Sequence, residues 1–298
     1  METESSIIPL QPITNAITKK YGIHLFMLRL DLNHPHISGN KLLKLKYNVE
    51  EAKKQRKKTI LTFGGAFSNH IAATAAAGKE HGFKTIGIIR GDELKETNTT
   101  LKSARENGML LHYVSRESYR DKSALYKYVH EKFTNEDFYL IPEGGSNKLG
   151  VLGCTEIVKN ISIDFNYICS PCGTGATLSG IIMSLKKDQQ AIGFQILKNE
   201  NYIKNEVENW LNQFEFKEKI NWQINEDHHF GAYAKINAEL IEFVERLKEE
   251  NNIPLDYVYT GKMMFGIYKL IENGFFKRGE VIIAVHTGGL QGNSGFEH

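Results

Sequence analysis

The sequence predicts an α/β protein built from two open, twisted parallel-sheet domains, and three observations carry this prediction. Short apolar runs alternate with amphipathic stretches along nearly the whole chain, as expected where helices connect parallel strands. Most of these apolar runs lack a polar alternation, which is typical of strands covered on both faces. The length of 298 residues is sufficient for two domains of ordinary size.

The expected strands fall into two series, separated by helical segments. The first series comprises 59–65, 84–91, 110–115 and 138–145, and the second comprises 167–177, 191–197 and 281–289. Helical segments are expected at 69–82, 98–108 and 117–133, and the first two end on glycines suited to helix C-caps. We expect a large domain of residues 1–45 with 157–298, a small domain of residues 46–156, and a cleft between them.

Composition excludes several classes of protein. A formal charge of +2 gives no reason to expect a nucleic-acid or membrane partner, and the amino terminus lacks a secretory signal, so we expect a cytoplasmic protein. Cys154, Cys169 and Cys172 are too few for a disulfide framework, and we interpret them as buried or loop thiols. The adjacent His228 and His229 fit no metal-ligand spacing, so no metal is expected.

Four strand ends carry glycine-rich loops: GGAFSN, EGGSNKLG, CGTGAT and HTGG. Because ligands bind at the carboxyl ends of strands in open α/β sheets, these loops are expected to converge on one pocket. The loop CGTGAT places several backbone N–H groups before a helix that starts near Thr177, with Thr174 and Thr177 as hydroxyl donors, which suits a phosphate. Neither a dinucleotide nor a Walker pattern is present, so a monophosphate fits best; a tight turn without ligand is the alternative.

The turn formed by Ser68, Asn69 and His70 lies where a strand passes into a helix, so its free N–H groups can hold a carboxylate. Asn69 could donate to a phenolate or carbonyl oxygen, whereas no nucleophile elbow surrounds Ser68. The alternative role is helix N-capping. Lys41 alone would be a surface charge, but an amine together with a phosphate cradle and a partner for a ring oxygen describes pyridoxal phosphate.

Six segments make the interpretation specific. SGNKLLKLKYN, GGAFSNH, CGTGAT, GAYAK, YTGKMMFG and HTGG follow the order found in the fold type II, tryptophan-synthase-like pyridoxal-phosphate enzymes. The sequence most resembles the 1-aminocyclopropane-1-carboxylate deaminase and D-cysteine desulfhydrase family, from about Asn33 to Gly289. The resemblance implies a cofactor in the cleft between the domains, a small amino-acid substrate and a homodimer.

The resemblance also implies roles for individual residues. Lys41 matches the lysine that binds the cofactor covalently, Lys44 matches a residue that assists its phosphate, and Asn69 matches the partner of its ring hydroxyl. Ser68 matches the polar residue beside the substrate carbon, and the turn from Ser68 to His70 would hold the substrate carboxylate. The phosphate loop corresponds to Cys172, Gly173, Thr174, Gly175, Ala176 and Thr177.

Tyr233 and Tyr259 match active-site tyrosines proposed for proton transfer, with a core position as the alternative. Thr260 and Thr287 stand where the deaminases have a glutamate and a leucine, which resembles the desulfhydrase branch. We therefore expect α,β-elimination from a small amino acid, with D-cysteine, which would give pyruvate, ammonia and sulfide, as the leading candidate.

The alternatives are deamination of 1-aminocyclopropane-1-carboxylate, a cofactor-binding protein without turnover, and a nucleotide-binding α/β protein. Three departures from the family pattern bear on the substrate: Leu43 replaces a frequent arginine, Ala66 and Phe67 precede Ser68 where glutamine is common, and the chain is short before Tyr233.

Overall fold

The computed structural model describes residues 8–92, 98–231 and 235–296, and within these ranges it contains two separate sheets. The larger sheet has the strand order β1-β2-β10-β7-β8-β9, and the smaller sheet has the order β5-β4-β3-β6. The strands of the larger sheet are β1 (Leu10–Ile13), β2 (His24–Leu28), β7 (Tyr167–Cys172), β8 (Gln190–Gln195), β9 (Asn221–Asn225) and β10 (Val281–Val285). Those of the smaller sheet are β3 (Thr59–Gly65), β4 (Lys84–Arg90), β5 (Met109–Val114) and β6 (Phe138–Ile141).

Every pairing in both sheets is parallel except that of β1 with β2, so the predicted fold class is confirmed with one antiparallel edge strand added. The helices alternate with the strands along the chain. They are α1 (Ala16–Tyr21), α2 (Asn40–Lys54), α3 (Asn69–His81), α4 (Thr99–Glu106), α5 (Arg116–Arg120), α6 (Lys122–Lys132), α7 (Lys148–Cys154), α8 (Ala176–Ile182), α9 (Tyr202–Gln213), α10 (Ala238–Asn251) and α11 (Thr260–Glu272).

Strand β10 lies inside the larger sheet and has apolar side chains on both faces. Ile282 and Ala284 pack into a cluster with residues of α10 and α11, whereas Ile283 and Val285 pack into a cluster with residues of α8 and α9. A parallel strand buried on both sides needs this continuous apolar run, because successive side chains point to opposite faces.

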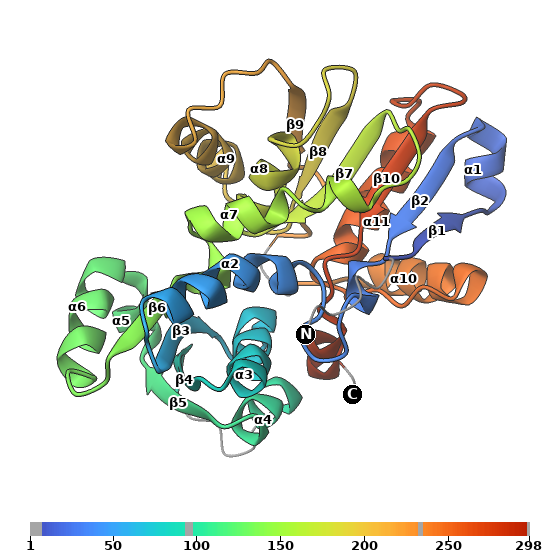
Figure 1. Ribbon diagram of the computed structural model, residues 1–298. Coiled ribbons are helices and arrows are strands. Elements are labelled where there is room, and N and C mark those ends of the chain that lie inside the picture. Colours follow the sequence, from blue (N-terminus) through green and yellow to red (C-terminus); the bar gives the residue numbers. More distant parts are fainter. Residues whose placement is uncertain (1–7, 93–97, 232–234, 297–298) are drawn as a thin grey trace.

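Helix α2 runs between the two sheets, and it packs against α7, which in turn packs against α8 of the larger sheet (Figure 1). The four strands of the smaller sheet all lie between Thr59 and Ile141 in the sequence. The first turn of α2 contacts loops that follow strands of both sheets, because Asn40 bonds to the loops after β10 and β7 and Lys41 to the loop after β6.

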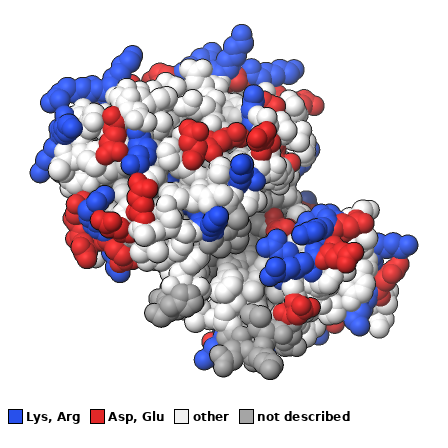
Figure 2. All heavy atoms as spheres, turned by 180° about the vertical axis from the view of Figure 1, so that it is seen from behind, with Lys and Arg blue, Asp and Glu red and all other residues white. Residues whose placement is uncertain are grey.

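On the face shown in Figure 2, acidic and basic side chains are interspersed, and an indentation separates the larger lobe from the smaller one. This mixture agrees with the nearly balanced net charge. Across the described ranges, no helix combines the length and the apolar character that crossing a membrane requires. The three cysteines are free and buried, as expected.

Candidate active site

The start of α2 is joined tightly to the turn after β10. Gly39 has φ of +72°, and a Cβ at this position would lie 1.9 Å from the backbone oxygen of Thr287, so only glycine can occupy it. The next residue, Asn40, donates its backbone N–H to the same oxygen at 3.3 Å. Lys41 is therefore presented from a helix start whose position is fixed by the HTGG turn.

The four glycine-rich loops converge, as the sequence predicts. The side chain of Asn40 donates to the Thr177 hydroxyl at 2.8 Å, which joins α2 to the CGTGAT loop. The hydroxyls of Ser146 and Thr174 lie 2.6 Å apart, which joins the EGGSN loop to the same CGTGAT loop. The sequence did not indicate that Asn40 and Ser146 would make these contacts between loops.

Two lysine amines lie side by side at this junction. Lys44 is buried and donates to the backbone oxygen of Gly144 at 3.1 Å, and partly buried Lys41 reaches the same oxygen at 3.5 Å. Among the described residues neither amine has a carboxylate partner. Burial, followed by the charge of Lys44, lowers the pKa of Lys41 well below its ordinary value, and burial also lowers the pKa of Lys44.

His70 is buried beside these amines, with its ring against Gly145. The Thr62 hydroxyl donates to the Ile141 carbonyl at 2.8 Å, so it must accept the hydrogen bond of 2.8 Å that joins it to Nε2 of His70. Nε2 therefore carries a proton, and Nδ1 has no hydrogen-bond partner among the described residues. Burial, then the charges of Lys41 and Lys44, hold the pKa of His70 well below its usual range.

The first residues of α3 have structural roles in addition to the predicted ones. The Ser68 side chain accepts the N–H of Ile71 at 3.4 Å and so caps the helix, which confirms the capping interpretation. Asn69 accepts a hydrogen bond at Oδ1 from the side chain of Gln291, and its Nδ2 lies against Gly289 of the HTGG turn. The loop before α3 and the HTGG turn therefore meet at Asn69.

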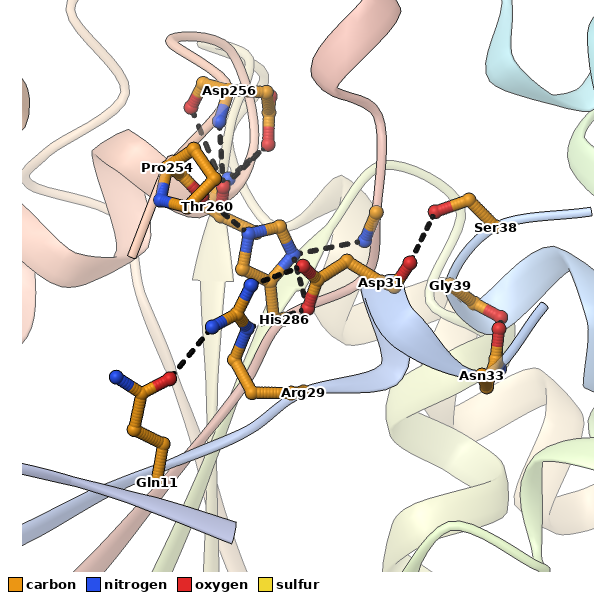
Figure 3. Close-up of polar contacts among 11 residues, drawn as sticks. Gln11, Arg29, Asp31, Asn33, Ser38, Gly39, Pro254, Asp256, Thr260 and His286 are labelled. Atoms are coloured by element: carbon orange, nitrogen blue, oxygen red, sulfur yellow. Dashed lines mark hydrogen bonds and ion pairs between the residues drawn. The ribbon is translucent and has the colours of Figure 1, made fainter. Parts of the chain in front are cut away.

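Thr260 opens α11 and is completely buried. Its hydroxyl donates to the Asp256 carboxylate at 2.5 Å and accepts the Asp256 N–H at 3.1 Å (Figure 3). The same carboxylate accepts three more N–H groups, from Val258, Tyr259 and Thr260. The Asp256 carboxylate is thus committed to the turn that leads into α11, and the sequence carries no signal for this role.

The HTGG turn has its own buried support (Figure 3). The N–H of Gly288 donates to Nδ1 of His286 at 3.2 Å, so Nε2 carries the proton and donates to the Pro254 oxygen at 2.8 Å. Asp31 lies 3.6 Å from Nδ1 of His286 and is neutralised by a two-bond pair with Arg29, at 2.9 and 2.7 Å. This network holds the backbone on either side of Thr287 in place.

Of the two tyrosines predicted for the active site, the structure describes Tyr259. A Cβ at Gly173 would lie 3.4 Å from the ring of Tyr259, so this tyrosine borders the CGTGAT loop. Tyr233 lies outside the described residues. His228 pairs with Asn225, and His229 accepts the N–H of Gly231, so both histidines shape their own loop.

Comparison with known proteins places this geometry in a family. Residues 6–288 match the family model described as pyridoxal-phosphate dependent enzyme. The chain belongs to this family. It is 31% identical, over 91% of its length and 73% of the relative, to the bifunctional D-cysteine desulfhydrase/1-aminocyclopropane-1-carboxylate deaminase of Arabidopsis thaliana, a mitochondrial protein.

Solved structures agree with this assignment. A crystal structure of an ACC deaminase homologue has a TM-score of 0.82 at 26% identity and covers 96% of this chain and 90% of that one. A hydrogen sulfide-producing enzyme of Fusobacterium nucleatum, with a TM-score of 0.70 at 14% identity over 98% of this chain and 99% of that one, shares the fold. The predictions of a fold type II enzyme and of pyridoxal phosphate as cofactor are confirmed.

The residues of this pyridoxal-phosphate dependent enzyme fit the cofactor's charge. The buried Lys44 amine has no carboxylate partner in the described ranges, and an anion beside it would favour its charged form against the effect of burial, so a phosphate fits there. The thiols of Cys154 and Cys172 cannot supply that charge, because burial raises the pKa of both, that of Cys172 to about 12. The individual roles assigned to the site residues stay predictions.

Proposed function

We propose that this enzyme is a lyase that catalyses α,β-elimination from a small amino acid with a good leaving group at the β-carbon, and D-cysteine is the leading candidate. In the overall reaction cysteine and one water give pyruvate, ammonia and hydrogen sulfide. The bond from the β-carbon to sulfur breaks, the α-proton is removed, and water replaces the amine, so neither an oxidant nor a reductant is needed.

The observation that carries this proposal is the pairing of Thr260 with Asp256. The deaminases that the sequence resembles have a glutamate at position 260, and a glutamate would keep the cofactor's ring nitrogen protonated. Here the position holds a hydroxyl whose proton is committed to Asp256, and that carboxylate already accepts four hydrogen bonds. Elimination of a good leaving group needs less electron withdrawal than opening a cyclopropane ring does, so this arrangement favours elimination.

Each of the remaining residues has a role that its surroundings support. Bound pyridoxal phosphate supplies an electron sink for the charge left on the α-carbon. Lys41, with its lowered pKa, is available as a neutral amine that can take the α-proton. Lys44 would hold the phosphate with the loop from Cys172 to Thr177, and the turn from Ser68 to His70 would hold the substrate carboxylate. Asn69 and Thr287 would contact the ring oxygen and the ring nitrogen.

Deamination of 1-aminocyclopropane-1-carboxylate is the second candidate. The Arabidopsis relative is named for both activities, and its similarity extends over most of this chain. The substrate and one water would give a four-carbon keto acid and ammonia.

The two reactions differ in their products, so one experiment separates them. Purified protein with pyridoxal phosphate is given D-cysteine, L-cysteine or 1-aminocyclopropane-1-carboxylate, while sulfide, ammonia and keto acids are measured. We expect sulfide and pyruvate in equal amounts from D-cysteine, with no product from Lys41→Ala. Four-carbon keto acid from the cyclopropane alone would favour the second candidate. No product together with an unchanged cofactor spectrum across a panel of amino acids would indicate a binding protein without turnover.

The resemblance supports the proposal that the enzyme is a homodimer, which light scattering would test. We also propose that it is cytoplasmic, which cell fractionation would test. The domain boundaries of 1–45 with 157–298, and of 46–156, are likewise proposed. The first boundary lies inside α2, where Leu45 is buried, so hydrogen exchange suits this division better than proteolysis: the amides of the smaller sheet should open together and separately from those of the larger sheet.

A further inference from the structure

The contact between Gln291 and Asn69 has no role in the scheme above. Gln291 lies in the 3₁₀ helix η4 (Leu290–Gly295), which follows the HTGG turn, and Asn69 is the first residue of α3. The side-chain Nε2 of Gln291 donates to Oδ1 of Asn69 across 222 positions of sequence. Both side chains are partly buried at the point where the two loops meet.

This contact decides which way the Asn69 amide faces. In this contact Nε2 of Gln291 is the donor, and the Asn69 atom that accepts the bond is its oxygen. The Asn69 nitrogen is then on the other side, where a Cβ at Gly289 would come within 2.4 Å of it. Gly289 has φ of +107° and no side chain, and this leaves room for the Asn69 NH₂ group.

We propose that Gln291 is a positioning residue that holds the Asn69 amide with its NH₂ group available to the ring oxygen of the cofactor. This inference rests on the proposed role of Asn69. An N–H donor stabilises an anionic oxygen more than a neutral hydroxyl, because a hydrogen bond to a charged acceptor is the stronger one. Gln291 thereby favours the deprotonated ring oxygen, although it does not itself touch the cofactor.

The segment that carries Gln291 is held independently of this contact. Asn293 donates its side-chain amide to the Leu255 oxygen at 2.9 Å and accepts the Tyr257 N–H at 3.2 Å. On the opposite side, the Ser294 hydroxyl lies 2.6 Å from that of Thr99 in α4. Replacing Gln291 should therefore leave η4 in place, and Ser294 offers a matched control on the same turn.

The test compares Gln291→Glu, Gln291→Ala and the control Ser294→Ala, each loaded with pyridoxal phosphate and without substrate. A carboxylate at position 291 accepts rather than donates, so the Asn69 amide would turn over and face the ring oxygen with its own oxygen. We expect the absorption band of the anionic ring form to lose intensity to that of the neutral form, by about tenfold in their ratio at neutral pH. The alanine variant should shift in the same direction by less, and Ser294→Ala should match the parent protein.

A second measurement keeps the test independent of folding. Thermal unfolding and near-ultraviolet circular dichroism of the cofactor-free variants should match those of the parent protein. If Gln291→Glu folds and its spectrum equals that of Ser294→Ala over the whole pH range, Gln291 does not position Asn69 and the inference is wrong. If the loaded parent protein shows no cofactor absorption that depends on Lys41, the proposed function itself is wrong. This result is distinct from the failure of the inference about Gln291.

Discussion

The two ends of the proposed cofactor site differ in how well their own polar groups are satisfied. At the amine end, formed by Lys41, Lys44 and His70, two amines share one backbone oxygen, and Nδ1 of His70 has no partner in the part of the chain that the structure describes. At the threonine end, formed by Asp256, Thr260 and His286, the Asp256 carboxylate alone accepts four hydrogen bonds. Both ends are buried, so solvent does not explain the difference.

The difference indicates what each end does. Leaving a buried polar group without a partner costs about 1–3 kcal/mol, so an unsatisfied cluster persists where a ligand completes it. The amine end is therefore where the cofactor's negative charge fits. The threonine end holds α11 and the HTGG turn in place. Most of its polar groups already bond to one another, so few of them are available to the cofactor. Removing a residue should thus lower stability at the threonine end and cofactor affinity at the amine end.

The largest effect is expected for Asp256→Ala. This change leaves the buried Thr260 hydroxyl and three N–H groups at and just before the start of α11 without their acceptor. We expect the free energy of unfolding to fall by about 3 kcal/mol, measured by urea denaturation of the cofactor-free protein. The control is Asn237→Ala, which removes a cap of α10 with one bond, to Leu240, and should cost about 1 kcal/mol. Equal losses for the two variants would contradict the special status of the threonine end.

A smaller effect, on binding instead of stability, is expected for Lys44→Met. The methionine fills similar space but lacks the charge, so affinity for pyridoxal phosphate should fall by about tenfold to a hundredfold, in line with the loss of a buried charge-assisted hydrogen bond. Fluorescence titration of the cofactor-free protein would measure it. Lys46→Met is the matched control on the same helix, because Lys46 pairs with Glu156 at the surface. A loss of affinity as large for Lys46→Met would mean that general charge, and not the buried amine, attracts the phosphate.

Much of the fold could be predicted from the sequence, because its central strands are apolar along their whole length. The predicted strand at 59–65 coincides with β3, and the strand at 84–91 differs from β4 by one residue. Strands β1, β2 and β9 were not predicted. β1 and β9 are short edge strands, with a proline in the first and polar ends in the second, and edge strands need no continuous apolar run. β2 (His24–Leu28) lies inside the larger sheet, and its short apolar run was overlooked. The helix expected at 117–133 is in fact two helices, divided at Asp121, which caps the second one.

The candidate site likewise has parts that the sequence predicts and parts that it does not. The glycine-rich loops were predictable because they follow buried strands, and parallel topology brings such strand ends together. Asn40, Asp256 and Gln291 were not singled out, since each one acts through a partner distant in sequence or through the geometry of a local turn. A single polar side chain carries no periodic signal, so its partner becomes visible only when the chain is folded.

The smallest expected effect concerns His70, and it depends on pH. The pKa of His70 lies well below its usual range in the folded protein, whereas in the unfolded chain it should be ordinary, about 6.5. Below that pH the unfolded chain takes up a proton that the folded protein does not, so stability falls as the pH falls and is unaffected above it. One such proton contributes a slope of about 1.4 kcal/mol per pH unit.

His70→Gln should remove this part of the slope, because glutamine can donate to Thr62 as Nε2 of His70 does but cannot titrate. The comparison uses cofactor-free protein unfolded with urea at a series of pH values between 5 and 8, and imidazole NMR signals report the protonation of His70 directly. We expect the two proteins to differ in their loss of stability by about 1 kcal/mol at pH 6 and about 2 kcal/mol at pH 5. If His70 instead gains its proton near pH 6.5 in the folded state, neither burial nor the charges of Lys41 and Lys44 lower its pKa. The amine end would then lack the unsatisfied, cationic character that distinguishes it from the threonine end.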